Sequence, residues 1–178
     1  MNKVKLADVK IGDVFKINGI EFIKMSEKDG VVEAVTKDIV FRSDFGTDNN
    51  FANSTVLKRL NTEFLPKIIE IVGAENVVEF ETDLTTLDGL KPYPKMLSKV
   101  SLPTFDFYRK NVEIFDKHKV DVWWWLATAD SAKPHYEPIW VVCVSPRGRV
   151  SSFIYSSDGI GVRPFLNFVS EIFVSFEE

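Results

Sequence analysis

Val122-Trp123-Trp124-Trp125-Leu126-Ala127 is the stretch that decides the fold, because it is apolar, aromatic and typical of a buried strand. Successive side chains of a strand point to opposite faces, so Trp124 points away from Trp123 and Trp125. Both faces of this strand must therefore be covered. We expect the core on one face and loops or an N-terminal lobe on the other; alternatively, one face forms an exposed aromatic patch that binds a protein.

The rest of the C-terminal part also has the pattern of strands. Pro146-Arg147-Gly148 predicts the turn of a hairpin, and Asp158-Gly159 predicts a further turn. The predicted strands cover residues 139–144, 150–155, 162–168 and 172–176.

Residues 1–42 predict a β-meander. Asn18-Gly19 is a strong hairpin signal, because both central positions of a type I′ turn need a positive φ, and Asp29-Gly30 marks the next turn. The predicted strands are residues 13–17, 20–25 and 31–35, with a weaker fourth strand at 39–41. We therefore expect an N-terminal lobe over residues 1–42 and a body over residues 43–178, packed as one compact unit.

Short helices are predicted in the middle of the chain. Ser54 is a suitable N-cap for a helix with apolar positions at Leu57, Leu60 and Phe64. Pro66 is expected to begin a second short helix that Gly73 ends. A third helix over residues 104–110, a short strand at 77–80 and loops at 43–53 and 83–89 complete the prediction. The fold class is therefore α+β.

Composition limits the class of protein. The 178 residues are 45% apolar and 13% aromatic, which predicts one folded domain. The net charge of −4 argues against generic binding to the phosphate backbone of nucleic acids, which needs a basic surface. Neither a secretory signal nor a membrane-spanning segment is expected, so we expect a cytoplasmic protein in which Cys143 is reduced.

The sequence lacks the motifs of the common enzymes. Gly159-Ile160-Gly161-Val162-Arg163-Pro164 has Pro where a dinucleotide loop needs its third Gly, and it opens no predicted helix. With His118, His135 and one Cys, no metal site and no cofactor is predicted. Cys143 lies in an apolar run and is expected to pack as a small hydrophobic residue, with the nucleophile as the weaker alternative.

Several motifs together resemble a known family. Trp123 to Thr128 is followed by Gly161-Val162-Arg163-Pro164-Phe165, and residues 53–65 fit an Asn-Ser helix with a Leu-Asn pair. This ordered set resembles an uncharacterised Firmicute and phage family of domains of unknown function, and more distantly the C-type-lectin-like and formylglycine-generating-enzyme folds. The resemblance implies a C-type-lectin-like, twisted antiparallel sheet with two or three short helices and the N-terminal β-meander attached.

The sequence departs from the best-known activities of these folds. Glu137-Pro138 is followed by Ile139, and no Trp-Asn-Asp strand exists, so calcium-dependent sugar binding is not carried over. The formylglycine-generating reaction needs a pair of cysteines, whereas Cys143 is alone. The resemblance therefore implies a fold and does not imply a reaction.

A run of acidic residues between Lys67 and Lys91 is the first candidate binding surface. It contains no Lys or Arg and supplies more than the whole net charge. One interpretation is that the aspartates bond their own turns while the glutamates face water. The other is an acidic surface that binds a basic protein groove. The candidate residues are Glu70, Glu75, Glu79, Glu81, Asp83 and Asp88.

A second candidate is an aromatic and loop patch in the C-terminal half. It combines exposed aromatic residues with the arginines of the predicted hairpin tip. Its members are Trp124, His135, Tyr136, Trp140, Arg147 and Arg149. Arg163 is expected to be structural, held by carbonyl groups or by an acid such as Asp121.

These features favour a non-catalytic protein-binding module of phage or prophage origin. A concrete version is an inhibitor of a host defence nuclease that presents the acidic residues to a nucleic-acid channel. The alternatives are a virion or surface component that binds a glycan or receptor, and an enzyme with an unrecognised site. The sequence leaves the partner and the oligomeric state open.

Overall fold

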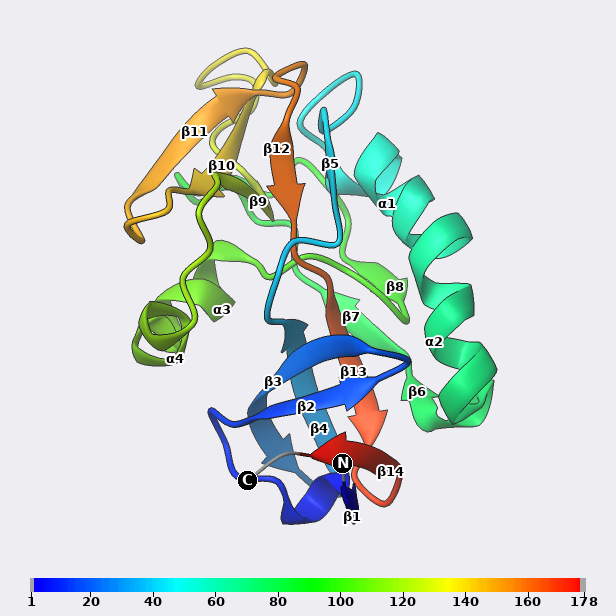
Figure 1. Cartoon of the computed structure of the whole chain (residues 1–178). Coiled ribbons are helices and arrows are strands. Elements are labelled where there is room, and N and C mark those ends of the chain that lie inside the picture. Colours follow the sequence, from blue (N-terminus) through cyan, green and yellow to red (C-terminus); the bar gives the residue numbers. More distant parts are fainter. Residues whose placement is uncertain (1, 177–178) are drawn as a thin grey trace.

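The computed structural model describes residues 2–176 and shows a mixed α+β fold built mainly of antiparallel sheet (Figure 1). Within these residues the strands form one sheet of seven, one of five and one of two. The first, which we call the large sheet, is antiparallel throughout. Its order is β1 (Asn2–Lys5), β14 (Phe173–Phe176), β2 (Val14–Ile17), β3 (Ile20–Lys28), β4 (Val31–Thr36), β13 (Phe165–Val169) and β6 (Val77–Val78).

The predicted N-terminal meander is confirmed as β2, β3 and β4. Asn18 and Gly19 have φ values of 51° and 75°, and Asp29 and Gly30 have 51° and 77°, as type I′ turns require. The C-terminal strands β13 and β14 pair with β4 and β2, so residues from both predicted ranges, 1–42 and 43–178, lie in one sheet. Strand β1 gave no sequence signal and pairs with β14.

The second sheet, which we call the small sheet, is built around the tryptophan strand. Its order is β11 (Val150–Ile154), β10 (Trp140–Val144), β9 (Trp124–Ala129), β12 (Ile160–Val162) and β5 (Phe41–Ser43). Every residue of β9 is buried. Trp124 packs against Tyr108 and Phe115, whereas Trp125 packs on Phe45 from the opposite face. The two-sided coverage expected for this strand is therefore confirmed.

The fourth strand of the meander was placed wrongly. The weak prediction at 39–41 corresponds to β5, which begins at Phe41 and leaves the meander to pair with β12 in the small sheet. The predicted strand at 162–168 is also wrong as a single element, because the chain leaves the small sheet after Val162 and enters the large sheet at Phe165. The residues between them are Arg163 and Pro164.

Arg163 fills the crossing between the two sheets. Its side chain is 1% exposed, and its Nε donates a hydrogen bond to the Thr36 carbonyl at 3.1 Å. The guanidinium carbon lies 4.9 Å from the Trp124 ring centre and 5.5 Å from that of Phe115. A carbonyl rather than Asp121 holds it, and Asp121 is exposed.

The buried position of Arg163 disfavours its charged form. Burial lowers the pKa of Arg163 to about 10, because the charged form loses water, and the charge of Asp38 opposes that shift. Backbone bonds hold the same crossing, since Thr36 N donates to Pro164 O at 3.0 Å and Val40 N donates to Val162 O at 3.0 Å. The segments β4–β5 and β12–β13 thus pass between the sheets side by side.

One continuous helical run follows β5 (Figure 1). It consists of α1 (Thr55–Arg59), a π-helical turn η3 (Leu60–Phe64) and α2 (Leu65–Val72), with Ser54 as N-cap and Gly73 at the end. Pro66 was expected to separate two helices. Instead the helix widens just before it, where the missing N–H of proline cannot continue the regular bonding.

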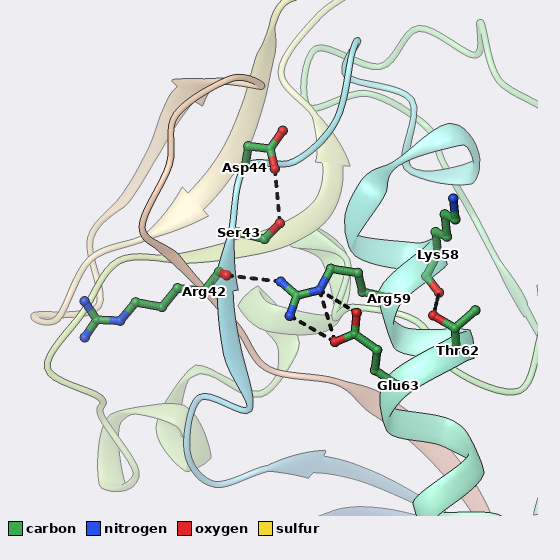
Figure 2. A network of polar contacts seen from close by, with 7 residues as sticks. All are labelled: Arg42, Ser43, Asp44, Lys58, Arg59, Thr62 and Glu63. Carbon is green, nitrogen blue, oxygen red and sulfur yellow. Dashed lines mark hydrogen bonds and ion pairs between the residues drawn. The ribbon is translucent and has the colours of Figure 1, made fainter.

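Arg59 attaches this helical run to β5 (Figure 2). Its guanidinium bonds the Arg42 carbonyl at 3.3 Å and Glu63 at 3.0 Å. It also lies 4.0 Å from the centre of the Phe41 ring. The contacts with Arg42 and Phe41 reach from the helical run to β5, whereas Glu63 lies one turn further along the run itself.

Two short helices cover the other side of the molecule (Figure 1). The predicted helix is α3 (Phe105–Lys110), capped by Thr104, and α4 (Val112–Lys117) follows it without having been predicted.

A third sheet contains two strands, β7 (Phe80–Thr82) and β8 (Met96–Ser98). Short turns complete the fold at η1 (Leu6–Asp8), η2 (Phe51–Asn53) and η4 (Ala74–Asn76). No helix within residues 2–176 is long and apolar enough to span a bilayer.

Replacing Arg163 tests the crossing. We expect Arg163→Ala to lower the free energy of unfolding by about 3 kcal/mol, because it leaves a cavity beside the Trp124 and Phe115 rings and an unbonded Thr36 carbonyl. Urea denaturation measures the change. The control is Arg147→Ala at the exposed hairpin tip, expected to change stability by less than about 0.5 kcal/mol. Equal stability of the two variants would show that the crossing does not depend on the guanidinium.

Candidate functional site

A cleft of about 700 Å³ opens between β7, the start of α3 and the β13 strand. The loop at residues 83–89 borders it as well. These elements come from three separate parts of the chain. The cleft is therefore a product of the tertiary fold and has no single sequence motif.

Alternation along two strands shapes the interior of the cleft. Phe80 and Thr82 share one face of β7, and Phe165 and Asn167 share one face of β13, because side chains two residues apart point the same way. The Phe80 and Phe165 rings are in edge contact, with centres 4.9 Å apart, and Phe107 contacts Phe165 at the same distance. Phenylalanine rings therefore pack together where β7 meets β13.

Two oxygen atoms of the cleft are buried without a partner. Neither Thr82 Oγ1 nor Asn167 Oδ1 has a hydrogen-bond partner among the described residues. The Thr82 residue is only 4% exposed. A buried polar atom that lacks a partner costs about 1–3 kcal/mol. Such atoms are uncommon in folded proteins, and each calls for an explanation.

Carboxylates line the same cleft. The described residues that line the cleft include four acids, Glu33, Glu81, Asp83 and Asp106, and two bases, Arg109 and Lys110. Glu33 is the cross-strand neighbour of Asn167, so the two side chains lie on the same face of the large sheet.

Most of the cleft acids already have partners. Glu81 pairs with Lys95 at 2.7 Å, and Asp106 pairs with Arg109 at 2.9 Å. Asp83 accepts hydrogen bonds from the hydroxyl and the backbone N–H of Thr85, which lowers the pKa of Asp83. These pairs at the rim are exposed and are easily exchanged for a ligand, because exposed ion pairs contribute little.

The structure divides the predicted acidic run into three groups. Glu81 and Asp83 line the cleft. Asp88 takes part in a separate polar cluster. The remaining acids are exposed and have no hydrogen bond or ion pair with any described residue: Glu70, Glu75 and Glu79.

Asp88 joins the predicted acidic run to the predicted aromatic and loop patch, to which His135 belongs. Its carboxylate accepts hydrogen bonds from Ser131 Oγ at 2.6 Å and Thr86 Oγ1 at 2.5 Å, and it lies 2.9 Å from His135 Nδ1. These bonds, that of Ser131 above all, lower the pKa of Asp88 well below its ordinary value. The cluster fastens the loop bordering the cleft to the 130–138 loop.

The predicted aromatic patch is only partly present. Trp124 is 2% exposed and belongs to the core, so its place in a binding patch was wrong. Tyr136 and Trp140 are exposed, and Trp140 lies opposite the exposed Ile154 in the β10–β11 register. Arg147 and Arg149 are exposed near the turn between these strands.

Cys143 lies in the core rather than in a site. It is fully buried in β10, and burial raises the pKa of its thiol to about 12. The thiol is therefore neutral at physiological pH and packs as a small hydrophobic residue. Within residues 2–176, no group of three or more His, Cys, Asp or Glu side chains is arranged to hold a metal ion.

Sequence reasoning missed the residues that define the cleft interior. Thr82, Asn167 and Glu33 carried no motif, and only the pairing of distant strands brings them together. The Phe80 and Phe105 rings could be predicted as apolar, but their place beside a cleft could not.

Comparison with family models, curated proteins and solved structures finds no match to this chain.

The Asp88 cluster gives a pH-dependent prediction. Because folding favours the ionised form of Asp88, its stabilisation is present at neutral pH and is lost as the pH falls below about 4. We expect Asp88→Asn to be less stable than the wild type by about 1 kcal/mol at pH 7. The difference should shrink steadily in urea denaturations between about pH 5 and pH 2. A difference that stays constant over this range would contradict the assignment.

Proposed function

We propose that this protein is a non-catalytic protein-binding module whose acidic cleft takes a basic segment of a partner. The observation that carries the proposal is the convergence of Glu33, Glu81, Asp83 and Asp106 around one cleft. These acids come from three segments of the chain: β4, the end of β7 with the residue after it, and α3. A concave, acidic, partly apolar site of this kind fits a cationic group better than an anionic one.

The exposed acids beside the cleft extend the same charge. Glu79 directly precedes β7, and it has no hydrogen bond or ion pair with the described residues. Unpaired surface charges steer an oppositely charged partner and make its association sensitive to salt. A nuclease whose nucleic-acid channel is basic would be a suitable partner, and an inhibitor of a host defence nuclease is the concrete form of the proposal.

The origin and the finer fold are part of the proposal and rest on sequence alone. The Trp123 to Thr128 and Gly161 to Phe165 motifs support membership of the Firmicute and phage family and a C-type-lectin-like body. A phage or prophage protein that acts against a host defence would be used inside the bacterial cell.

A glycan is the second candidate ligand, because the same cleft offers hydroxyl groups and aromatic rings. Thr82, Thr85 and Thr128 line it together with Phe80 and Phe105. Neutral hydroxyl donors and ring faces are common features of sugar sites. A glycan, however, leaves the carboxylates around the cleft without a role, so the basic protein segment is favoured.

Charge reversal at the cleft tests the proposal. We expect a hexalysine peptide to bind the wild type at about 20 mM salt and to be released at about 500 mM, because screening weakens exposed charge pairs. Glu81→Lys should weaken the binding at least about tenfold. Isothermal titration calorimetry measures both effects.

Glu113→Lys is the matched control, since Glu113 is an exposed acid on α4 that does not line the cleft. This variant makes the same change in net charge and should bind hexalysine within about twofold of the wild type. An equal loss of hexalysine affinity in the two variants would contradict the proposal, because it would indicate an effect of net charge alone.

A further inference from the structure

We infer that Glu33 is the residue of the cleft that holds a basic side chain of the partner, with Asn167 beside it; this rests on the proposed function and identifies the ion-pair partner within that site. The exposed acids at the rim, Glu81, Asp83 and Asp106, then attract the partner without fixing the position of its charged group. No sequence motif marks Glu33.

The first step of the argument is the place of Glu33 in the large sheet. It lies on β4, which pairs with β3 on one side and with β13 on the other. Its directly opposite neighbours are Ser26 and Asn167. Residues that are directly opposite share a face of the sheet, with Cβ atoms about 4.5–5.5 Å apart. Because Glu33 and Asn167 also both line the cleft, one ligand group can reach the two side chains together.

The second step is the charge of Glu33, which has no counter-charge in contact. Glu33 is half-buried, its carboxylate accepts a hydrogen bond from Ser26 Oγ at 2.7 Å, and it forms no ion pair with the described residues. Of the two bases that line the cleft, Arg109 pairs with Asp106, and Lys110 is in no ion pair within residues 2–176. A partly buried charge without a partner is costly, and a bound cation offsets that cost.

The third step is the neutral acceptor beside this charge. Asn167 Oδ1 is buried and has no hydrogen-bond partner in the described part of the chain. The charged end of a basic side chain carries several N–H donors and can bond a carboxylate and an amide oxygen at once. Hydrogen bonds between an ionised donor and a carboxylate are the stronger kind. A cationic donor therefore suits this pair better than a neutral one.

Phenylalanine rings lie next to these two side chains. Phe165 lies two residues before Asn167 on the same face of β13, and its ring centre is 4.9 Å from those of Phe80 and Phe107. The methylene groups of a basic side chain pack on apolar surfaces while the charged end reaches polar partners. Thr82 lies beyond the Phe80–Phe165 contact, because β6 and β13 are antiparallel, and it is not part of this subsite.

Neutralising Glu33 tests the assignment, with calorimetric titration of the full chain by hexalysine at about 20 mM salt as the measurement. Glu33→Gln removes the charge at constant size and should weaken hexalysine binding at least about tenfold. Glu113→Gln, on α4 and outside the cleft, is the matched control and should bind within about twofold of the wild type. Glu33→Asp keeps the charge and should bind within about threefold.

Salt separates direct contact from attraction at a distance, because half-buried charge pairs are screened less than exposed ones. At about 150 mM salt we expect Glu33→Gln to remain about tenfold weaker than the wild type. Glu79→Gln neutralises an exposed acid beside the cleft. It should weaken hexalysine binding about twofold at about 20 mM salt and have no effect at about 150 mM.

Urea denaturation distinguishes a binding role from a structural one. Because the Glu33 carboxylate has no counter-charge in contact, Glu33→Gln should be at least as stable as the wild type. Loss of hexalysine binding together with a lowered urea midpoint would show a structural role and overturn the inference. If Glu33→Gln and Glu113→Gln bind equally while Glu81→Lys still loses binding, the assignment of Glu33 is wrong and the acidic cleft stands. If hexalysine does not bind the wild type, the proposed function fails and the inference fails with it.

Discussion

The buried guanidinium of Arg163 stabilises the place where the chain passes between the two sheets. At this point two neighbouring segments pass between the large sheet and the small one, and the side chain donates to the Thr36 carbonyl and lies beside the Trp124 and Phe115 rings. Burying a charge without a carboxylate in contact is costly, so the surrounding rings and carbonyl must offset that cost. The same crossing sets where β13 begins, and β13 carries Phe165 and Asn167 into the cleft.

The cleft contains buried polar atoms that lower the stability of the fold. Thr82 Oγ1 and Asn167 Oδ1 are buried without partners, although a hydrophobic residue at either position would avoid that cost. The surrounding structure is well fastened, since Asp88 bonds Ser131 and Thr86 and thereby holds the loop beside the cleft. A rigid rim around unpaired acceptors is the arrangement expected of a preorganised binding site.

Local chemistry could be predicted from the sequence, and non-local chemistry could not. Turns such as Asn18-Gly19 and caps such as Ser54 depend on a few adjacent residues, and the structure confirms them. The break at Arg163 and Pro164 was missed, because the apolar run continues across it and only the pairing partners change. For the same reason Asp88 and His135 were assigned to separate surfaces, although the fold brings them together.

Nuclear magnetic resonance of the Asn167 side-chain amide tests whether the cleft takes a basic segment, because Asn167 lines the cleft. During titration of the full chain with hexalysine, we expect the amide signals of Asn167 to shift and to saturate together with calorimetric binding. The exposed amide of Asn61, which lies on the helical run and does not line the cleft, is the internal reference and should not move. Binding that saturates while the Asn167 signals stay unchanged would place the ligand outside the cleft and contradict the proposed function.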